Sequence, residues 1–520
     1  MGIPSYFAHI VKRYRQIIKL RTGIGPVDNL YLDSNSLIYD VVNTLKNDMS
    51  PADINDFICT AVNEKIDHLL SLIKPTKRLF ITFDGVAPLA KMEQQRRRRF
   101  MTAYDIDKSS AAIFNTACIT PGTVFMEQLR TSVHSHFKRT DIQILISAAD
   151  EVGEGEHKIF SLMRKEPLYH ETTVTVVYGL DADLIMLGLL HNPVYLFRET
   201  PEFIKHLDRS LLANELYVLD LPELALRLNT VQPVQAIQPV QPMQPAQYLN
   251  DYIFICFFLG NDFLPHFPAL NIRTNGIDRL LQTYTKCNSL PLINLASRQI
   301  IWKNVRLFVT DLAKNEHEYI LVEMKKRAEQ QLQQQKFSRK KEEEIDPLKE
   351  RAIELYINPS EAGWEARYYS SLFGVRIDDE RRKEISVNYL EGLEWTWKYY
   401  TTGCPDWRWK YKYAYPPLLA DLIKFTPYFD VAFFNAKNLL AKPVKPLVQL
   451  AYVLPRPFLN LLPSQTLKTR LLADKTFSSY YPEESSTTFL WAFCRYFWEA
   501  HVIVQEPDLL ALEKLVDETY

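Results

Sequence analysis

Short apolar runs alternate with longer amphipathic stretches in the first half of this chain. The runs at 29–33, 78–84, 142–148 and 174–181 are rich in β-branched and aromatic residues, and each has the length of a strand buried on both faces. Each run is followed by a stretch whose apolar positions recur with helical spacing. This alternation of strand and helix predicts an α/β fold with a mainly parallel sheet flanked by helices.

Two segments lack the pattern of a packed element. Residues 230–247 carry Gln at every third position from 232 onwards with interspersed prolines, which predicts an exposed polyproline-II insertion. Residues 324–351 are charged and Gln-rich, which is typical of an exposed helix or loop. We therefore expect a core at 1–323, a charged linker at 324–351, and an aromatic-rich, mostly helical region at 352–520 packed on the core.

Composition excludes several classes of protein. The chain has 520 residues, 47% hydrophobic, and no apolar run approaches the ~18 residues of a membrane span. Six scattered cysteines without a CxxC pair argue against a disulfide framework or a zinc finger and favour a reducing compartment. Lys and Arg number 61 against 62 Asp and Glu, so the net charge is −1 and any nucleic-acid partner must be met by a local basic patch.

Carboxylates recur where the predicted strands end. In a parallel sheet the carboxyl ends of the strands meet at one edge, so side chains placed there converge. Two further acids stand in the glycine-flanked turn VGEGEH, and one ends the apolar helix predicted around 251–262. The acids are Asp33, Asp84, Glu154, Glu156, Asp181, Asp183 and Asp262.

A single one of these acids would fit a helix N-cap or a turn equally well. Seven carboxylates in one crevice need protons or cations, because their mutual repulsion opposes ionisation. Oxygen ligands without clustered His or Cys favour Mg²⁺, with Mn²⁺ as a substitute, over zinc. The pattern predicts a site for two such ions, which suits hydrolysis of a phosphodiester bond.

A basic helix is predicted directly after Asp84, in GVAPLAKMEQQRRRRF. Four of its polar side chains fall on one helical face, whereas Arg96 and Arg97 project elsewhere. The face consists of Lys91, Gln95, Arg98 and Arg99. Standing alone, such a helix would be equally well explained as a solvated surface. Beside an acidic site, its donors suit a terminal phosphate, which predicts a nuclease that selects an end.

With these motifs in order along nearly the whole chain, the sequence resembles the XRN family of 5′→3′ exoribonucleases. The matching stretches are MGIPSYF, DNLYLDSNSLIYD, FDGVAPLAKMEQQRRRRF, ITPGTVFM, VGEGEHKI, VYGLDADLIML, LGNDFLPHFP, YLEGLEWTWKYYTTGCPDWRWKYKYAYPPLLADL and KPLVQLAYVLP. The resemblance implies a PIN/FEN-like nuclease core and a compact member limited to the catalytic core. It also implies that the same seven acids are the catalytic, metal-binding residues and that the same four basic-face residues bind a 5′-monophosphate.

The resemblance further implies that aromatic rings stack on the first bases of the RNA. Where the family places a His after the first Asp, this chain has Tyr39, whose ring can still stack. A Trp from the region 395–409 is expected to complete the stack; we take it to be Trp395, and the register within that region stays open. Two further departures from the family motifs are Leu89 in place of Arg and Val152 in place of Pro.

His157 and Lys158 follow the acids of VGEGEH, and they fit secondary contacts or helix-start residues equally well.

The sequence as a whole predicts a processive, Mg²⁺-dependent 5′→3′ exoribonuclease. Its expected substrate is single-stranded RNA with a 5′-monophosphate. The alternatives are a structure-specific 5′ flap nuclease, a 5′→3′ DNA exonuclease, or a non-catalytic RNA-binding protein. We expect a monomer with no membrane association that receives its substrates from decapping factors. The cytoplasm is the expected compartment, and the nucleus stays open as the alternative.

Overall fold

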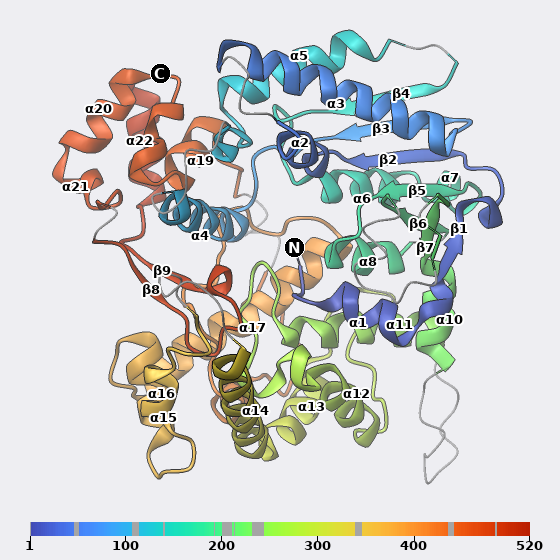
Figure 1. Ribbon diagram of the computed structural model, residues 1–520. Coiled ribbons are helices and arrows are strands. Elements are labelled where there is room, and N and C mark those ends of the chain that lie inside the picture. Colours follow the sequence, from blue (N-terminus) through green and yellow to red (C-terminus); the bar gives the residue numbers. More distant parts are fainter. Residues whose placement is uncertain are drawn as a thin grey trace. The chain divides into compact units, whose positions relative to one another are not determined.

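The computed structural model describes residues 2–45, 51–106, 114–138, 141–191, 193–199, 211–212, 214–230, 244–337, 346–434, 441–483 and 486–519 (Figure 1). The chain forms two compact units that interleave along the sequence. The sheet unit comprises Phe7–Arg227, Ala441–Thr487 and Val504–Tyr520. The helical unit comprises Met1–Tyr6, Leu228–Leu440 and Thr488–Ile503.

A seven-stranded sheet organises the sheet unit, in the order β1-β7-β6-β5-β2-β3-β4. Its strands are β1 (Ile18–Leu20), β2 (Asn29–Asp33), β3 (Arg78–Thr82), β4 (Gln143–Ser147), β5 (Thr175–Tyr178), β6 (Val194–Phe197) and β7 (Tyr217–Asp220). Strands β2 to β6 pair in parallel, and β7 runs antiparallel to both β6 and β1. This confirms the mixed, mainly parallel sheet, and the four predicted runs are β2 to β5. Strands β1, β6 and β7, which have three or four residues each, were not predicted.

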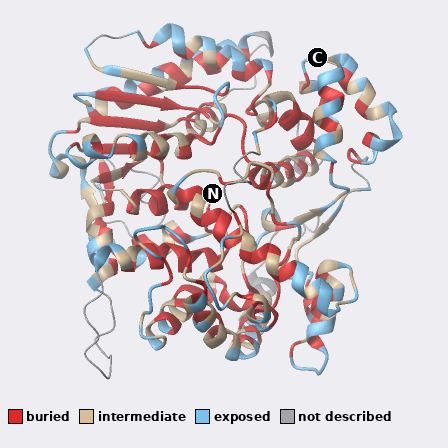
Figure 2. Ribbon diagram, turned by 180° about the vertical axis from the view of Figure 1, so that it is seen from behind, coloured by how far each residue is buried: buried red, intermediate tan, exposed pale blue. Residues whose placement is uncertain are grey.

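Helices cover both faces of this sheet (Figure 1). The helices of the N-terminal segment, some of which cover the sheet, are α1 (Tyr6–Arg13), α2 (Asn35–Val42), α3 (Pro51–Ile73), α4 (Leu89–Ile106), α5 (Val124–His136), α6 (Gly155–Lys165), α7 (Pro167–Glu171), α8 (Ala182–Leu189) and α10 (Leu221–Thr230). The apolar faces of α2, α3 and α5 share one core with the central strands. Helices α6 and α8 lie on the opposite side of the sheet. Figure 2 shows the central strands among the buried elements, as expected for strands covered on both faces.

A second core in the sheet unit joins α4 to the C-terminal part of the chain. That part contributes α19 (Pro446–Val453), α20 (Gln465–Ala473), α21 (Lys475–Ser478) and α22 (Leu509–Thr519). Met92 of α4 is buried in one cluster with Val448, Tyr452 and Leu512. The two compact units are each built from several segments of the sequence, so their boundaries differ from the predicted boundaries at 323 and 351. Those predicted boundaries were drawn from changes in composition, and the division into three sequence regions stays a prediction.

Helices dominate the helical unit, which also holds one antiparallel hairpin. Its elements are α11 (Pro245–Cys256), α12 (Gly276–Lys286), α13 (Trp302–Lys314), α14 (Glu316–Phe337), α15 (Ala352–Ile357), α16 (Trp364–Phe373), α17 (Asp379–Thr401), α18 (Leu419–Phe425), β8 (Thr488–Leu490) and β9 (His501–Ile503). The C-terminal region is thus mostly helical, as predicted. The β8–β9 hairpin was not predicted from the sequence.

The two segments predicted to be exposed are only partly described. Residues 231–243 of the insertion lie outside the described residues, and Pro245 already stands in the first turn of α11, where its missing N–H costs nothing. The predicted linker begins inside α14, and residues 338–345 lie outside the described residues. Arg327, within that linker, is buried, so the expectation of an entirely exposed run is wrong at this position.

All six cysteines are free thiols, in agreement with the scattered spacing in the sequence. Within the described ranges, no helix has both the length and the apolar character needed to cross a bilayer.

Candidate active site

The carboxyl ends of β2 and β3 bring the first two acids to one edge of the sheet. Asp33 is the last residue of β2 and pairs in register with Thr82, the last residue of β3, and Asp84 follows two residues later. The chain turns from β2 to β3 and β4 on one side, then crosses over to β5 and β6 on the other. The edge beside Asp33 is therefore the point where the winding reverses, and open α/β sheets form their binding crevice there.

The glycine-flanked turn before α6 adds Glu154 and Glu156 to the same edge. Gly153 has a φ of +104°, a conformation that side chains disfavour, and this bend brings Glu154 to the start of α6. A Cβ atom on Gly155 would lie 2.7 Å from Oδ1 of Asp33, so only glycine permits this close approach. Glycine at 153 and 155 thus lets the two glutamates turn inward together, as the sequence predicts.

Two overlapping groups of potential metal ligands result. One ligand atom each from Asp33, Asp84 and Glu156 lie within 4.8 Å of one another, and the same holds for Glu154, Glu156 and His157. Glu156 belongs to both groups and links them. We call these residues the acid cluster.

A network of hydrogen bonds fixes the carboxylate of Asp84. Asn35 at the start of α2 donates from Nδ2 to Asp84 Oδ2 at 2.7 Å, and the backbone N–H of Asp84 donates to Asn35 Oδ1 at 3.1 Å. The N–H of Gly155 donates to Asp84 Oδ1 at 2.8 Å. Both carboxylate oxygens are thereby oriented before any ligand arrives.

Asp181 and Asp183 stand at the start of α8, directly after β5. Asp181 occupies the N-cap position and is exposed, whereas Asp183 in the first turn is buried. The charge of Asp181 is one of the causes that raise the pKa of Asp33, which places it near the acid cluster. Asp262 belongs to the helical unit, so its grouping with the other six acids stays a prediction.

Burial and mutual repulsion disfavour the ionised form of the carboxyl groups in the acid cluster. Loss of water raises the pKa of Asp33 well above its usual range, and the neighbouring charges of Asp84 and Asp181 raise it further. Burial, followed by the charges of Glu154 and Asp33, likewise raises the pKa of Glu156. A divalent cation would relieve this repulsion, and close-set carboxylate oxygens are the donors that Mg²⁺ and Mn²⁺ prefer. The residues of the acid cluster therefore fit such an ion.

The predicted basic face lies on α4 and begins at the acid cluster. Lys91 is almost fully buried, and its Nζ forms an ion pair with the carboxylate of Glu154. Oε1 of Gln95 accepts a hydrogen bond of 3.0 Å from Nε2 of Gln449 in α19. Arg98 is exposed. The face thus runs from a buried lysine in contact with the acid cluster to an arginine open to solvent.

The other arginines of α4 differ in their surroundings. Arg99 donates from Nη2 to the carbonyl oxygen of Ile119 at 2.9 Å and to Oγ1 of Thr120 at 3.0 Å. Arg96 is buried and donates to the backbone carbonyls of Tyr452 and Tyr480 at 2.6 and 2.7 Å. Arg96 therefore stabilises the packing of α4 on the C-terminal segment, in agreement with its predicted projection away from the basic face.

Comparison with known proteins assigns the chain to a family. Residues 1–200 match the family model for the XRN 5′-3′ exonuclease N-terminus, and residues 243–358 and 322–489 match that for the Xrn1 helical domain. The chain belongs to the XRN family. The predicted resemblance is thereby confirmed.

Several relatives of the XRN family share most of this chain. The Drosophila melanogaster 5′-3′ exoribonuclease 2 homolog is 28% identical over 623 residues, which cover 93% of this chain and 67% of the relative. The Saccharomyces cerevisiae 5′-3′ exoribonuclease 1 is 28% identical over 633 residues, covering 93% of this chain and 41% of the relative. The human 5′-3′ exoribonuclease 1 is 29% identical over 572 residues, covering 94% and 32%. The chain thus spans between about a third and about two thirds of the length of these relatives.

The aromatic residues predicted to stack on bases lie in different surroundings. Tyr39 is half-buried on α2 and packs against the main core of the sheet unit. Trp395 on α17 has no exposed surface, donates from Nε1 to the carbonyl oxygen of Asp406 at 2.8 Å, and contacts the rings of Phe263 and Trp409. A base can reach Trp395 only if these neighbours separate. Its role stays a prediction that this packing does not favour.

The two residues predicted to depart from the XRN motifs differ in burial: Leu89 is buried and Val152 is exposed. Leu89, where the family has Arg, is buried in the second core of the sheet unit at the start of α4. Val152, where the family has Pro, is exposed before the glycine turn. Neither side chain belongs to the acid cluster.

Sequence reasoning missed several residues that hold the site in place. Asn35 carried no signal beyond its position two residues after Asp33, and Gln449 lies 354 residues from its partner Gln95. Lys158, left open between two roles, donates from Nζ to the carbonyl oxygens of Phe83 and Ala148 at 2.8 and 2.7 Å. Lys158 therefore ties the ends of β3 and β4 to α6.

Proposed function

We propose that this protein is a processive 5′→3′ exoribonuclease that degrades single-stranded RNA bearing a 5′-monophosphate to nucleoside 5′-monophosphates. The observation that carries the proposal is the ion pair between Lys91 and Glu154, because it joins the acid cluster to the basic face of α4 within one unit. Membership of the XRN family and similarity to 5′-3′ exoribonucleases support the same activity.

We assign metal binding to the predicted acids, with Asp33, Asp84 and Glu156 as the closest group. Divalent cations held by carboxylates supply an activated water and charge stabilisation at the leaving oxygen of a phosphodiester. The protein contributes by holding its carboxylates in fixed orientations through hydrogen bonds. Asn35 and the N–H of Gly155 do so for Asp84. Because these donors are already arranged, little reorganisation is needed when the substrate binds.

The basic face gives a physical reason for direction. A 5′-monophosphate is a dianion rich in acceptors, and the guanidinium of exposed Arg98 with the ammonium of Lys91 supplies matching donors. Each cleavage leaves a new 5′-monophosphate on the shortened RNA, which again suits the basic face. The enzyme therefore proceeds from the 5′ end without releasing its strand, and capped ends bind poorly.

A time course with 3′-labelled and 5′-labelled RNA tests the proposal. Four substrates differ only at the 5′ end, which carries a monophosphate, a hydroxyl, a triphosphate or a cap. We expect mononucleotide release from the monophosphate RNA alone, dependent on Mg²⁺ and supported by Mn²⁺. Preference for a flap DNA of equal length would assign a flap nuclease instead, and tight binding without hydrolysis would assign a non-catalytic RNA-binding protein.

We further propose that the substrates come from enzymes that create 5′-monophosphate ends, such as decapping factors. This follows from the chemistry of the end that the basic face suits.

A further inference from the structure

The β8–β9 hairpin of the helical unit presents a stacked pair of aromatic rings to solvent. The rings of Tyr496 and Trp498 lie 5.8 Å apart between centroids with an interplanar angle of 13°. Their residues are 47% and 48% exposed, although large aromatic side chains are usually buried. A flat, half-exposed pair of rings is the kind of surface on which unpaired bases stack.

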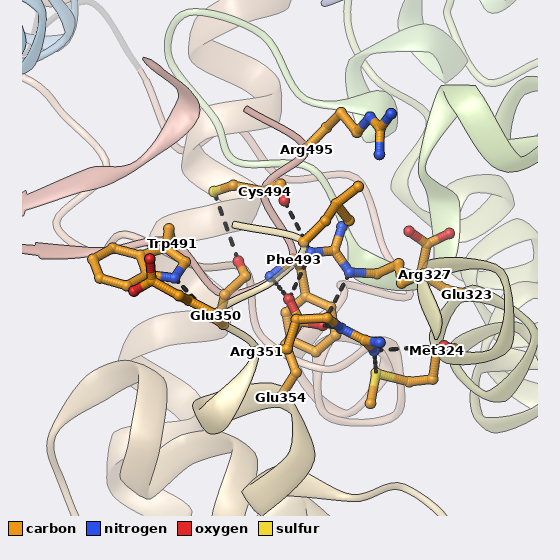
Figure 3. A network of polar contacts seen from close by, with 12 residues as sticks. Glu323, Met324, Arg327, Glu350, Arg351, Glu354, Trp491, Phe493, Cys494 and Arg495 are labelled. Carbon is orange, nitrogen blue, oxygen red and sulfur yellow. Dashed lines mark hydrogen bonds and ion pairs between the residues drawn. The ribbon is translucent and has the colours of Figure 1, made fainter. Parts of the chain in front are cut away.

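Two arginines flank this pair. The guanidinium carbon atoms of Arg273 and Arg495 lie 5.4 and 5.6 Å from the ring centroid of Tyr496. Arg273 is neutralised by Glu499, at 2.7 Å. Arg495 donates to the amide oxygen of Gln330 at 3.2 Å, and it has no carboxylate partner within ion-pair distance among the residues that the structure describes. Figure 3 shows its guanidinium apart from the contacts that join the neighbouring charged side chains. Of the two arginines, Arg495 therefore keeps a positive charge that no ion pair offsets among the described residues.

A buried ionic network holds the backbone that leads to these residues (Figure 3). Arg327 forms an ion pair of 2.6 Å with Glu354 and donates to the carbonyl oxygen of Cys494 at 2.9 Å. Glu354 also pairs with Arg351 at 2.7 Å and accepts the backbone N–H of Phe493 at 2.8 Å. The anchored residues directly precede Arg495. Because the backbone is fixed in this way, a ligand that binds the hairpin orders little of it.

We propose that Tyr496, Trp498 and Arg495 form a stacking platform for unpaired bases of single-stranded RNA, separate from the acid cluster. Because the two guanidinium groups already lie over Tyr496, the half-exposed Trp498 ring contacts the base face, with Tyr496 stacked against it, and Arg495 contacts a backbone phosphate. The positive charge of Arg495 favours a polyanion over a neutral apolar peptide, and stacking on rings tolerates any base sequence. This choice of RNA as the ligand rests on the proposed function.

Binding without hydrolysis tests the platform directly. The full chain is titrated into a fluorescent single-stranded RNA with a 5′-hydroxyl end in the presence of EDTA, and anisotropy gives Kd. We expect Trp498→Ala to weaken binding at least about fivefold, the effect of losing one stacked base, and Trp498→Phe to restore most of it. Arg495→Ala should lower the salt dependence of log K by about one ion. Tyr428→Ala, a matched change at another exposed aromatic residue of the same unit, should leave Kd unchanged.

Three results would overturn the platform. They are an unchanged Kd for Trp498→Ala, an equal loss for Tyr428→Ala, and equal competition by duplex RNA, which has no unpaired bases. Self-association of the wild type that Trp498→Ala abolishes would instead make this surface an interface between copies of the chain. A separate assay of 5′-monophosphate RNA with Mg²⁺ reads out hydrolysis. Wild-type protein that binds in EDTA but never hydrolyses would refute the proposed function and leave the platform standing.

Discussion

Lys91 and Glu154 form a buried ion pair, so a lysine predicted for the phosphate pocket contacts a glutamate predicted to bind metal. The ammonium of Lys91 therefore lies in the space around a carboxylate that a cation would share. The two predicted functions of the site are coupled through this one contact.

We expect Lys91→Met to lower the Mg²⁺ concentration needed for half-maximal activity by about threefold to tenfold, because a competing positive charge is removed from a partly buried site. The same variant should lose discrimination between 5′-monophosphate and 5′-hydroxyl RNA. Arg98→Ala is the matched control, since Arg98 is exposed to solvent: it should reduce discrimination and leave the Mg²⁺ requirement unchanged. A higher Mg²⁺ requirement in Lys91→Met would contradict the competition.

Asp181→Ala should abolish cleavage while RNA binding persists. Loss of one carboxylate from a metal site costs several kcal/mol of transition-state stabilisation, which corresponds to a rate reduction of about a thousandfold. Single-turnover cleavage and filter binding of the same 5′-monophosphate RNA measure the two properties separately. Full turnover by this variant would remove Asp181 from the set of metal ligands.

Asn35→Ala should weaken metal binding although Asn35 is not itself expected to bind the metal. Asn35 both donates to and accepts from Asp84, so its removal frees that carboxylate to rotate. Losses of about tenfold to a hundredfold in metal affinity are typical for such supporting contacts. Calorimetric titration with Mn²⁺ gives the affinity, and Asn55→Ala, at a half-buried asparagine of α3 that donates to Gln128, is the control. Unchanged affinity would show that Gly155 and the fold alone hold Asp84.

Metal binding should weaken as the pH falls. Burial and neighbouring acids raise the pKa of Asp33 and of Glu156, so protons compete with cations as the pH falls toward those values. Mn²⁺ titrations at about pH 6 and about pH 8 in buffers of different ionisation enthalpy should show weaker binding and proton release at the lower pH. An affinity independent of pH, without proton release, would mean that the acid cluster is already ionised.

Glu316 of the helical unit should make the stability of the protein depend on pH. Burial raises the pKa of this glutamate from 4.5 to about 7, although it accepts the N–H groups of Leu419 and Ala420. An acid with a raised pKa in the folded state contributes stability that is present at low pH and is lost as the pH rises through the folded value. We expect unfolding free energy to fall by on the order of 2 kcal/mol between about pH 5 and about pH 8.

The variant Glu316→Gln should remove most of that fall, because an amide does not titrate. Urea unfolding followed by tryptophan fluorescence at both pH values provides the measurement. Glu361→Gln, at an exposed loop position, should keep the wild-type dependence. Equal pH dependence in wild type and Glu316→Gln would assign the effect to other groups.

The sequence by itself determined the central strands, the acids that follow them and the position of the basic helix. Apolar runs of strand length specify β2 to β5, and parallel pairing brings the residues after such strands to one edge whatever the rest of the chain does. Asp33 and Asp84 therefore lie together because each follows an apolar run of strand length and because the two strands pair in parallel.

Contacts between distant segments were decided only by the tertiary structure. Gln449 reaches Gln95 across 354 residues, α19 and α22 join α4 in a second core, and Trp395 is enclosed by neighbouring rings. Periodicity reveals which face of a helix is apolar but not which element covers it, because apolar surfaces pack without directional preference. The sequence thus supplied the chemical groups, whereas the packing decided which of them are buried, paired or open to RNA.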